Sequence, residues 1–363
     1  IQVLADSHGN VVYLGDRDCS AQRRHQKLVE EAPAPNIPDD IRVAMGEAAV
    51  AVAKGCNYTN AGTVEFLFQD GDFFYLEMNT RLQVEHPVTE MVTGIDLVEQ
   101  QLRVASGEPL SFSQEDIVAS GHAIEFRINA ENPAGGRFLP APGHINTLKV
   151  PDGFGVRFDG GYEAGDEVSQ FYDNLIGKLV VWGSNRDTAI GRGLRALGEL
   201  KVSGVATTAS AASIIIGHPD FQNVTHSTRW VEEELEFPEE LVDQVSEEGA
   251  GFERQQATVE VNGRRFEVNV LVPDSKTRAP RRSTSGLSSS GSGSGQVLAP
   301  MQGTIVNVLV EEGSKIESGD PICVLEAMKM ENNVLAEKSG IVKEVLVSKG
   351  DSVGAGDVLA VIE

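Results

Sequence analysis

The sequence of 363 residues is long enough for two or three domains of ordinary size. Apolar residues make up 40% of it and charged residues 23%, as in ordinary soluble proteins, and no apolar run reaches the ~18–20 residues of a membrane helix. The 30 basic and 54 acidic residues give a formal net charge of −24, which argues against a general nucleic-acid binder because such a surface repels phosphates.

The three cysteines, Cys19, Cys56 and Cys323, are far apart and lack CxxC spacing. This pattern argues against a disulfide framework or a zinc knuckle and favours a reducing compartment: the cytoplasm, or the mitochondrial matrix in a eukaryote. The chain opens at Ile1-Gln2-Val3-Leu4, which reads as the middle of a strand without an initiator methionine. We therefore expect the sequence to be the later portion of a longer protein.

Residues 1–230 alternate between strand-like and helix-like patterns, which predicts an α+β enzyme body. Strands are expected at residues 3–5, 11–14, 63–68, 73–78, 123–130 and 175–181. Helices are expected at residues 43–53, 96–105 and 188–200.

Three features follow residue 230. Residues 231–253 hold ten acidic residues and no basic one, which indicates an exposed helix or a bridging segment. Two alternating runs in residues 257–272 surround Asn262-Gly263, which predicts a β-hairpin. Residues 283–296 contain eleven Ser or Gly among fourteen and are predicted to be a flexible tether averaging roughly 20 Å in length.

The C-terminal residues contain an internal repeat. Residues 297–326 align without gaps on residues 334–363, and twelve of the thirty positions are identical. Short β-branched runs with glycines at matching places indicate two copies of one small β-unit. Because thirty residues bury too little surface to fold alone, we expect the copies to pack as a flattened β-barrel with pseudo-twofold symmetry.

Lys329 lies in the link between the two copies and is expected at or beside a hairpin tip. Most lysines are simply solvated, but this one is flanked by Met328 and Met330 on a turn where polar residues are usual. The sequence Ala327-Met328-Lys329-Met330 closely resembles the biotin attachment site of biotin carrier domains. Lipoyl domains share the repeat architecture, but an acidic residue usually precedes their lysine.

Two glutamates are expected to face each other within residues 62–79. The apolar residues at even positions 64, 66, 68, 74, 76 and 78 predict one buried face of a hairpin with an odd-length turn around Gly71. In that register Glu65 opposes Glu77 on the other face, with Asn79 next along. Like charges in direct opposition are destabilising, so the pair either binds a divalent cation such as Mg²⁺ or points into water.

Residues 17–27 form a basic island in an acidic chain, which suggests an anion site. Strand alternation there places His25 and Lys27 on one face. A second polar cluster, residues 81–87, directly follows the glutamate pair. Taken singly, clusters of this kind are more often solvated surface patches than sites.

Together these segments resemble the ATP-grasp biotin carboxylase family. The resemblance rests on QRRHQK at 22–27, EFLF at 65–68, EMNTRLQVEHPVTEM at 77–91 and the strand at 121–131, and it runs through residues 1–230. The N-terminal domain of that family and its glycine-rich lid have no counterpart in the sequence.

The resemblance implies roles for individual residues. Glu65 and Glu77 would hold Mg²⁺ or Mn²⁺ against the ATP phosphates, with Asn79 beside them. Gln22, His25 and Lys27 would line the nucleotide, while Arg81, Gln83 and the backbone of Val84 would hold bicarbonate. Glu85 would be the general base and Arg127 would stabilise the biotin anion. Biotin would be attached to Lys329.

The resemblance also divides the chain and implies its fold. We expect residues 1–115 to be the ATP-grasp portion of a biotin carboxylase, 116–235 its C-terminal domain, 236–282 a bridging segment with a β-hairpin, 283–296 a linker and 297–363 the biotinyl carrier domain. The implied fold class is α+β: the C-terminal part of an ATP-grasp biotin carboxylase followed by a flattened β-barrel.

The implied function is that of an α subunit of an acyl-CoA carboxylase, since about sixty residues between 235 and 296 are too few for a carboxyltransferase domain. The expected partners are a carboxyltransferase β subunit, a biotin protein ligase and a second copy of the carboxylase part, with no nucleic acid and no membrane. Alternatives are a non-catalytic carrier fragment, a methylcrotonyl-CoA-type or pyruvate carboxylase α subunit, and another ATP-grasp ligase fused to a lipoyl carrier.

Overall fold

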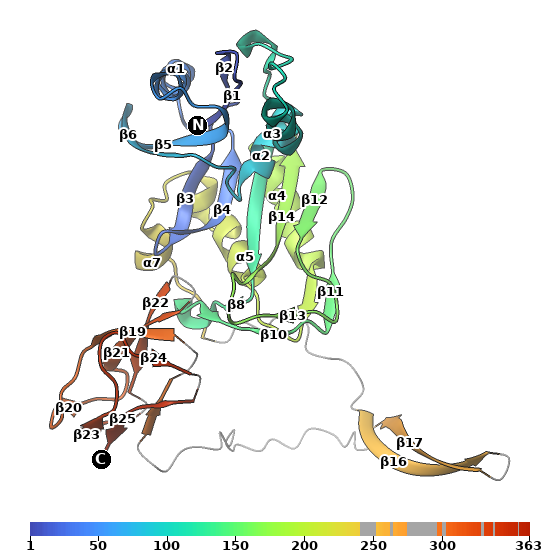
Figure 1. The fold of residues 1–363 in the computed structure, drawn as a ribbon, viewed down its shortest axis with the longest axis vertical. Helices are drawn as coiled ribbons and strands as arrows, with labels where there is room; N and C mark the ends of the chain where they lie inside the picture. Colours follow the sequence, from blue (N-terminus) through green and yellow to red (C-terminus); the bar gives the residue numbers. More distant parts are fainter. Residues whose placement is uncertain are drawn as a thin grey trace. The chain divides into compact units, whose positions relative to one another are not determined.

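The computed structural model describes residues 1–239, 252–261, 264–273, 296–299, 303–327, 330–336, 338–354 and 356–363 (Figure 1). They form two compact units: one holds nearly all of residues 1–239, and the other holds the strands from residue 252 onward. Within these residues no helix is long and apolar enough to cross a membrane.

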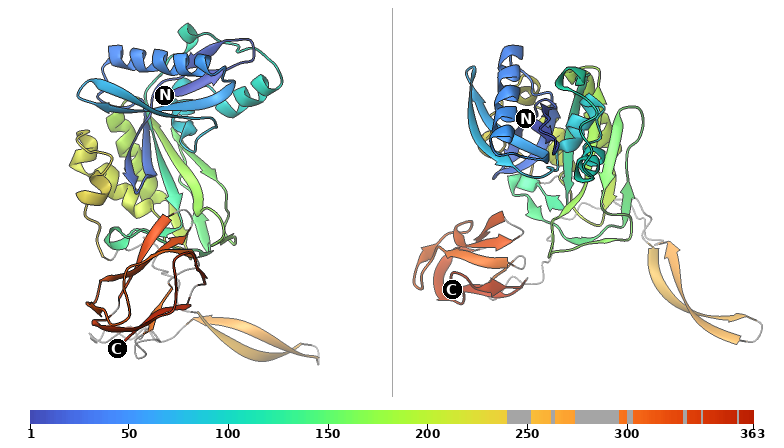
Figure 2. Two further views of the ribbon diagram at one scale, coloured as in Figure 1. Left: turned by 60° about the vertical axis from the view of Figure 1, so that its left-hand side comes forward. Right: turned by 45° about the horizontal axis from the view of Figure 1, so that its top comes forward.

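The first unit begins with an antiparallel four-stranded sheet. Its strand order is β2 (Val11–Tyr13), β1 (Gln2–Ala5), β5 (Asn60–Gln69) and β6 (Asp72–Asn79). Helix α1 (Asp39–Gly55) buries Met45, Ala49 and Ala53, spaced four residues apart, against one face, and Figure 2 shows it running across the sheet. Helix α3 (Leu97–Ala105) buries Leu97 against the opposite face.

A second, five-stranded antiparallel sheet forms the body of this unit. Its order is β12 (Val156–Gly160), β14 (Leu175–Gly183), β7 (His122–Asn129), β4 (Gln26–Ala32) and β3 (Asp18–Arg23). Helices α4 (Arg186–Glu199) and α5 (Ala209–Gly217) cover one face around Phe126. Helix α2 (His86–Thr93) packs Val88 and Val92 on the other face, which carries the polar residues described below.

Shorter elements complete the first unit. They are η1 (Gln114–Asp116), β8 (Glu131–Asn132), η2 (Ala134–Gly136), β9 (Leu139–Pro140), β10 (Gly143–His144), β11 (Thr147–Lys149), β13 (Glu167–Val168), β15 (Lys201–Ser203), α6 (Pro219–Gln222) and α7 (Trp230–Glu233). The predicted helices at 43–53, 96–105 and 188–200 and the six predicted strands of residues 1–230 are all present, each with ends shifted by no more than a few residues.

The β5–β6 hairpin confirms the opposition of Glu65 and Glu77, but the predicted turn and buried face are wrong. The turn has two residues, Asp70 and Gly71, both at positive φ, so Phe68 pairs with Phe73. A bulge after Glu65 adds one residue to β6 and brings Glu77 back opposite Glu65. That extra residue changes the phase of alternation, and Phe74 and Leu76 are 59% and 55% exposed.

The second unit contains the predicted hairpin and the predicted barrel. Strands β16 (Phe252–Val261) and β17 (Arg264–Pro273) are paired antiparallel up to Val261 and Arg264. The other strands are β18 (Gln296–Leu298), β19 (Gly303–Val308), β20 (Lys315–Ile316), β21 (Pro321–Ala327), β22 (Met330–Leu335), β23 (Gly340–Val345), β24 (Ser352–Val353) and β25 (Val358–Ile362).

The barrel confirms the internal repeat down to its register. Its sheets have the orders β18-β25-β23-β20 and β22-β21-β19-β24, which are equivalent under a shift of 37 residues. The bulge between Ile305 and Asn307 on β19 recurs between Val342 and Glu344 on β23. Buried side chains of both copies, such as Ile305 and Val342, form one core.

Some sequence predictions lie outside the described residues. These are the biotinylation of Lys329, the tether at 283–295, the Asn262-Gly263 turn and most of the acidic stretch at 240–251. Strands β21 and β22 pair as far as Ala327 and Met330, and the predicted attachment site lies between these two strand ends.

Candidate active site

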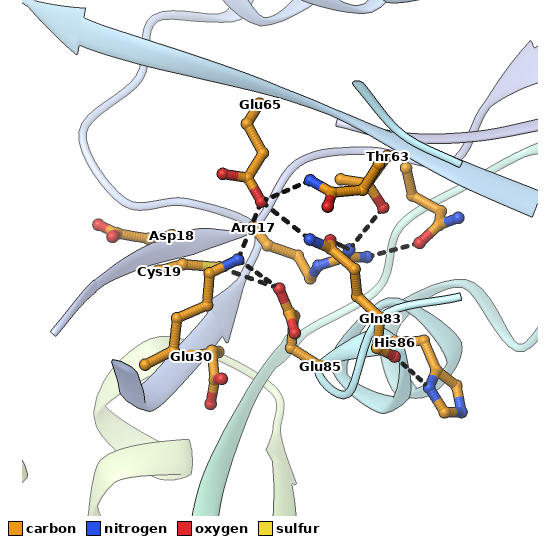
Figure 3. A network of polar contacts seen from close by, with 12 residues as sticks. Arg17, Asp18, Cys19, Glu30, Thr63, Glu65, Gln83, Glu85 and His86 are labelled. Carbon is orange, nitrogen blue, oxygen red and sulfur yellow. Dashed lines mark hydrogen bonds and ion pairs between the residues drawn. The ribbon is translucent and has the colours of Figure 1, made fainter. Parts of the chain in front are cut away.

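The predicted site residues of the first unit come from four places that the fold brings together. They lie on the β3–β4 hairpin, on the β5–β6 hairpin, in the segment between β6 and α2, and on β7 (Figure 3). The contacts below link these segments, which are far apart in the sequence.

Glu85 is at the centre of the cluster, at the N-cap of α2. Its Oε1 accepts from Lys27 Nζ at 2.6 Å, and its Oε2 accepts from Arg127 Nη2 at 3.0 Å. Burial by itself would raise the pKa of Glu85, but the charges of Arg17, Lys27 and Arg127 outweigh burial and lower the pKa to about 2. Glu85 is therefore a carboxylate at neutral pH, held between two cations.

Gln83 is the next junction in the network, and Figure 3 shows it beside Arg17 and Glu65. Its Nε2 donates to Glu65 Oε1 at 2.8 Å, and its Oε1 accepts from Arg17 Nη2 at 3.0 Å. Lys27 also donates to Glu65 Oε1, at 3.2 Å. The orientation of the Gln83 amide is thus set from both sides.

The opposed glutamates are joined by Asn79. Its Nδ2 donates to Glu65 Oε1 at 3.1 Å and to Glu77 Oε1 at 3.3 Å, which softens the repulsion of the two carboxylates. Oxygen atoms such as those of Glu65, Glu77 and Asn79 are the ligands that Mg²⁺ prefers, so this set of residues fits the predicted cation. The part of the chain that the structure describes contains no group of three or more His, Cys, Asp or Glu residues suited to a metal ion.

The predicted bicarbonate residues differ in how closely they contact the rest of the cluster. Arg81 is exposed, and among the described residues its guanidinium donates to the nearby Leu82 O and Asn79 Oδ1, both at 3.5 Å. The carbonyl of Val84 accepts from Lys178 Nζ at 3.0 Å, which ties the segment before α2 to β14.

Two predicted nucleotide residues lie at the edge of the cluster. Gln22 on β3 is half-buried opposite Lys27. The prediction that His25 shares a strand face with Lys27 is wrong. Arg24 and His25 form the β3–β4 turn with positive φ, and His25 is exposed. A turn residue has no fixed face of the sheet.

Several residues at the site were not singled out from the sequence, among them Arg17, Glu30, Glu125 and Lys178. Arg17 lies within the basic island, which was its available signal. Lys178 is one charge in an apolar strand, and it opposes Arg127 across β14 and β7. A single charged residue within an apolar run was the available signal for Lys178, but the residues that it contacts come from distant segments of the sequence.

Comparisons with known proteins agree with this architecture. Family models match residues 1–113 (carbamoyl-phosphate synthase L chain, ATP binding domain), 125–233 (biotin carboxylase C-terminal domain) and 295–362 (biotin-requiring enzyme). The chain has the biotin carboxylase ATP-grasp fold followed by a biotinyl domain. The predicted fold class is thereby confirmed.

Solved structures and curated relatives with the biotin carboxylase fold are similar to this chain over different spans. The biotin carboxylase domain of a thermophilic 2-oxoglutarate carboxylase bound to bicarbonate is 47% identical with a TM-score of 0.62, covering 64% of this chain and 52% of that one. The biotin-dependent acyl-coenzyme A carboxylase alpha3 subunit of Mycobacterium leprae is 45% identical and covers 92% of this chain and 59% of its own.

A pyruvate carboxylase subunit of Methanothermobacter thermautotrophicus is 53% identical over 64% of this chain and 47% of its own. The biotin carboxylase of Haemophilus influenzae is 50% identical over 65% and 52%. The chain thus spans about half to three fifths of the length of these relatives.

Proposed function

We propose that this chain is part of the α subunit of a biotin-dependent acyl-CoA carboxylase. It carboxylates biotin on its own Lys329 with MgATP and bicarbonate, and a separate carboxyltransferase β subunit transfers the carboxyl group to acetyl-CoA, propionyl-CoA or a related acyl-CoA of fatty-acid metabolism. The observation that carries the carboxylase activity is Glu85, a buried carboxylate held between Lys27 and Arg127.

MgATP binds as a substrate on the β3–β4 and β5–β6 side of the cluster. Glu65, Glu77 and Asn79 offer oxygens to the metal ion, and Lys27 supplies positive charge for the phosphates. Gln22 and His25 lie at the nucleotide edge of this surface. Phosphoryl transfer depends mainly on positioning and charge neutralisation, which this set of residues provides.

Bicarbonate binds through Arg81, Gln83 and the backbone at Val84. Arg81 is exposed in the described chain and turns its planar guanidinium fork towards the anion on binding. Glu85 then accepts the bicarbonate proton as the bicarbonate oxygen attacks the γ-phosphorus. The bond from that phosphorus to the β–γ bridging oxygen breaks and ADP leaves, which yields carboxyphosphate. A carboxylate paired with two cations is a weak base, so the engagement of Lys27 by phosphate is what restores its basicity.

Biotin, when attached to Lys329 between β21 and β22, would supply the nitrogen that takes up the carboxyl group. Arg127 offers the guanidinium that stabilises negative charge beside it, because its Nη2 reaches Glu85 from the sheet. Carboxyphosphate is labile, so its breakdown must take place beside biotin and away from bulk water.

The acyl-CoA assignment rests on the extent of similarity. The match to the acyl-coenzyme A carboxylase alpha3 subunit spans 92% of the chain, across the bridging hairpin and the barrel. The matches to biotin carboxylase and to the pyruvate carboxylase subunit span 65% and 64%. The expected partners are the β subunit, a biotin protein ligase that modifies Lys329 and a second copy of the carboxylase part.

The test uses the full-length protein, biotinylated and supplied with ATP and labelled bicarbonate. Label should enter the wild-type protein and be absent from Lys329→Arg, which also loses avidin binding. With its β subunit the protein should carboxylate acetyl-CoA or propionyl-CoA. Carboxylation of pyruvate but of neither acyl-CoA would overturn the acyl-CoA assignment. Incorporation of label into Lys329→Arg would overturn the carrier assignment.

A further inference from the structure

Two glutamates lie side by side beneath the candidate active site. Glu30 on β4 and Glu125 on β7 are direct partners in the antiparallel register, and both are 0% exposed. Directly opposed residues point to the same face of a sheet. Here it is the face that packs on α2 and carries Arg127.

Within the residues that the structure describes, only one of their four carboxyl oxygens has a hydrogen-bond partner. Glu30 Oε1 accepts from Arg127 Nε at 2.6 Å. Within the described chain, Glu30 Oε2 and both oxygens of Glu125 lack a hydrogen-bond partner. Two ionised carboxylates buried together with three bare oxygens would be very costly, whereas one proton removes a charge and creates a donor.

The charges around the pair leave Glu125 without a cation of its own. Arg127 is held by Glu30 and Glu85, and Lys178 by the Val84 carbonyl and Asp159. The ionisable groups that face this region from the neighbouring elements are Cys19, Lys27, Glu85, His86, Glu90, Arg157, Asp159 and Lys178.

We propose that Glu125 is held as a neutral carboxylic acid whose O–H donates to Oε2 of Glu30, and that this pair positions the Arg127 guanidinium on Glu85. Glu30 then remains the anion that fixes the Nε edge of Arg127, and the Nη2 group of Arg127 is free to reach Glu85. The effect on carboxylation rests on the proposed function, whereas the protonation of Glu125 does not.

The pH dependence has a definite sign. Burial, and then the charge of Glu30, raise the pKa of Glu125 well above its ordinary value. Above the ordinary pKa of a glutamate, the unfolded chain releases a proton that the folded chain keeps, so this contribution to stability is lost as the pH rises towards the folded-state pKa. In Glu125→Gln the stability should no longer fall with pH in this way, because the glutamine amide keeps a hydrogen-bond donor and does not titrate.

Infrared spectroscopy tests the protonation directly. The difference between the spectra of wild type and Glu125→Gln at neutral pH should contain the carbonyl stretch of a buried carboxylic acid. Glu31 on the same strand is held as an anion by Arg186 and His122, so Glu31→Gln should leave the band unchanged. A difference spectrum without this band overturns the proposal.

Unfolding gives a second readout. Both tryptophans of the sequence, Trp182 and Trp230, lie in the first unit, so their fluorescence follows its unfolding in urea. Above the ordinary pKa of a glutamate and up to neutral pH, the unfolding constant of wild type relative to Glu125→Gln should rise with pH, by at most about tenfold per pH unit. A pH-independent ratio contradicts a neutral Glu125.

The positioning role is tested by kinetics. Glu125→Leu lacks the donor and should lower kcat for biotin carboxylation by about tenfold to a hundredfold, with a smaller change in KM for ATP; Glu125→Gln should recover most of that loss. Equal kcat in Glu125→Leu and wild type rules out positioning. Wild-type protein that shows the acid band but no carboxylation refutes the proposed function and leaves Glu125 neutral.

Discussion

At the scale of single residues, Arg17 organises the candidate site without reaching its centre. Its Nη1 donates to Gln2 at 2.8 Å and to Thr89 at 2.9 Å, and its Nη2 donates to Thr63 at 3.1 Å and to Gln83 at 3.0 Å. All four acceptor residues are buried. One rigid fork thus joins β1, β5, α2 and the segment before α2.

Arg17→Lys should therefore disturb both stability and activity. A lysine has one nitrogen and cannot reach four acceptors on two sides, so buried oxygens lose their donor at a cost of about 1–3 kcal/mol. The freed Gln83 amide can rotate away from Glu65, and KM for bicarbonate should rise by about tenfold. Urea unfolding and steady-state kinetics measure the two effects.

The matched control is Arg103→Lys on α3. Arg103 is exposed and pairs with Glu99 and Glu108, which are exposed too. Exposed ion pairs contribute little, so neither stability nor kinetics should change measurably. If Arg17→Lys behaves like Arg103→Lys, Arg17 does not organise the site.

Glu77→Gln separates metal binding from structure. Removing one of two opposed carboxylates relieves repulsion with Glu65, so the melting temperature without nucleotide should be equal or higher. The rise caused by MgATP should be smaller, because a metal ligand is lost. Thermal denaturation with and without MgATP measures both effects, and strong destabilisation without nucleotide would make Glu77 a structural residue.

At the scale of elements, the β5–β6 hairpin shows how far alternation predicts a register. The opposition of Glu65 and Glu77 was correct although both the turn and the buried face were wrong, because a two-residue turn and a one-residue bulge compensate each other. Polar–apolar alternation has no signal for a bulge, since the inserted residue looks like any other strand residue.

The rest of the site shows the same limit. Linear motifs contained Glu65, Gln83, Glu85 and Arg127, and the contacts bring these residues together. Glu125 looked like one polar residue in a strand, since its partner Glu30 lies 95 positions earlier in the sequence. Pairings across a sheet of five strands are not encoded locally, so sequence reasoning could not find them.

The repeated barrel allows a paired test of one element. A Cβ added at Gly303 would lie 2.4 Å from the Glu326 carbonyl oxygen, and one at Gly340 would lie 2.5 Å from that of Glu363. Gly303→Ala and Gly340→Ala should each destabilise the barrel by about 1–3 kcal/mol through overpacking. Hydrogen exchange of the barrel strands in the full chain measures the loss.

Gly354→Ala is the control for this pair. A Cβ at Gly354 would meet its nearest atom, the Asp357 Oδ2, at 3.4 Å, which is an ordinary contact. Gly354→Ala should preserve the protection of the barrel strands against hydrogen exchange. Protection retained in only one of the two strand variants would show that the copies differ at this position despite their shared register.

At the scale of the whole molecule, the proposed chemistry needs a carrier that visits two places. Between Pro273 at the end of β17 and Gln296 at the start of β18 lie residues 274–295, 22 in number. Fully extended, they could span about 70–80 Å. The sequence predicts that most of this segment is a Ser/Gly tether, so its length should limit which sites biotin can reach.

Deleting residues 283–295 leaves nine residues, with a maximum span of about 30 Å. Effective concentration collapses once a linker cannot reach its site, so acyl-CoA carboxylation should fall much more than carboxylation of free biotin, which needs no arm. Replacing the same thirteen residues with a Gly/Ser sequence of equal length is the control and should keep both rates. Unchanged rates after the deletion would mean that movements of whole domains supply the reach.

The strand order of the barrel also determines the point in synthesis at which the barrel can complete its folding. Strand β18 pairs with β25, and β20 pairs with β23, so one sheet has no pairing within the first copy. Val297 and Ile316 on these strands stay without a core until residues 340–362 have left the ribosome. The segment around Lys329 emerges earlier than the strands that complete its scaffold, so a ligase that requires the folded barrel can act only after residues 340–362 have been synthesised.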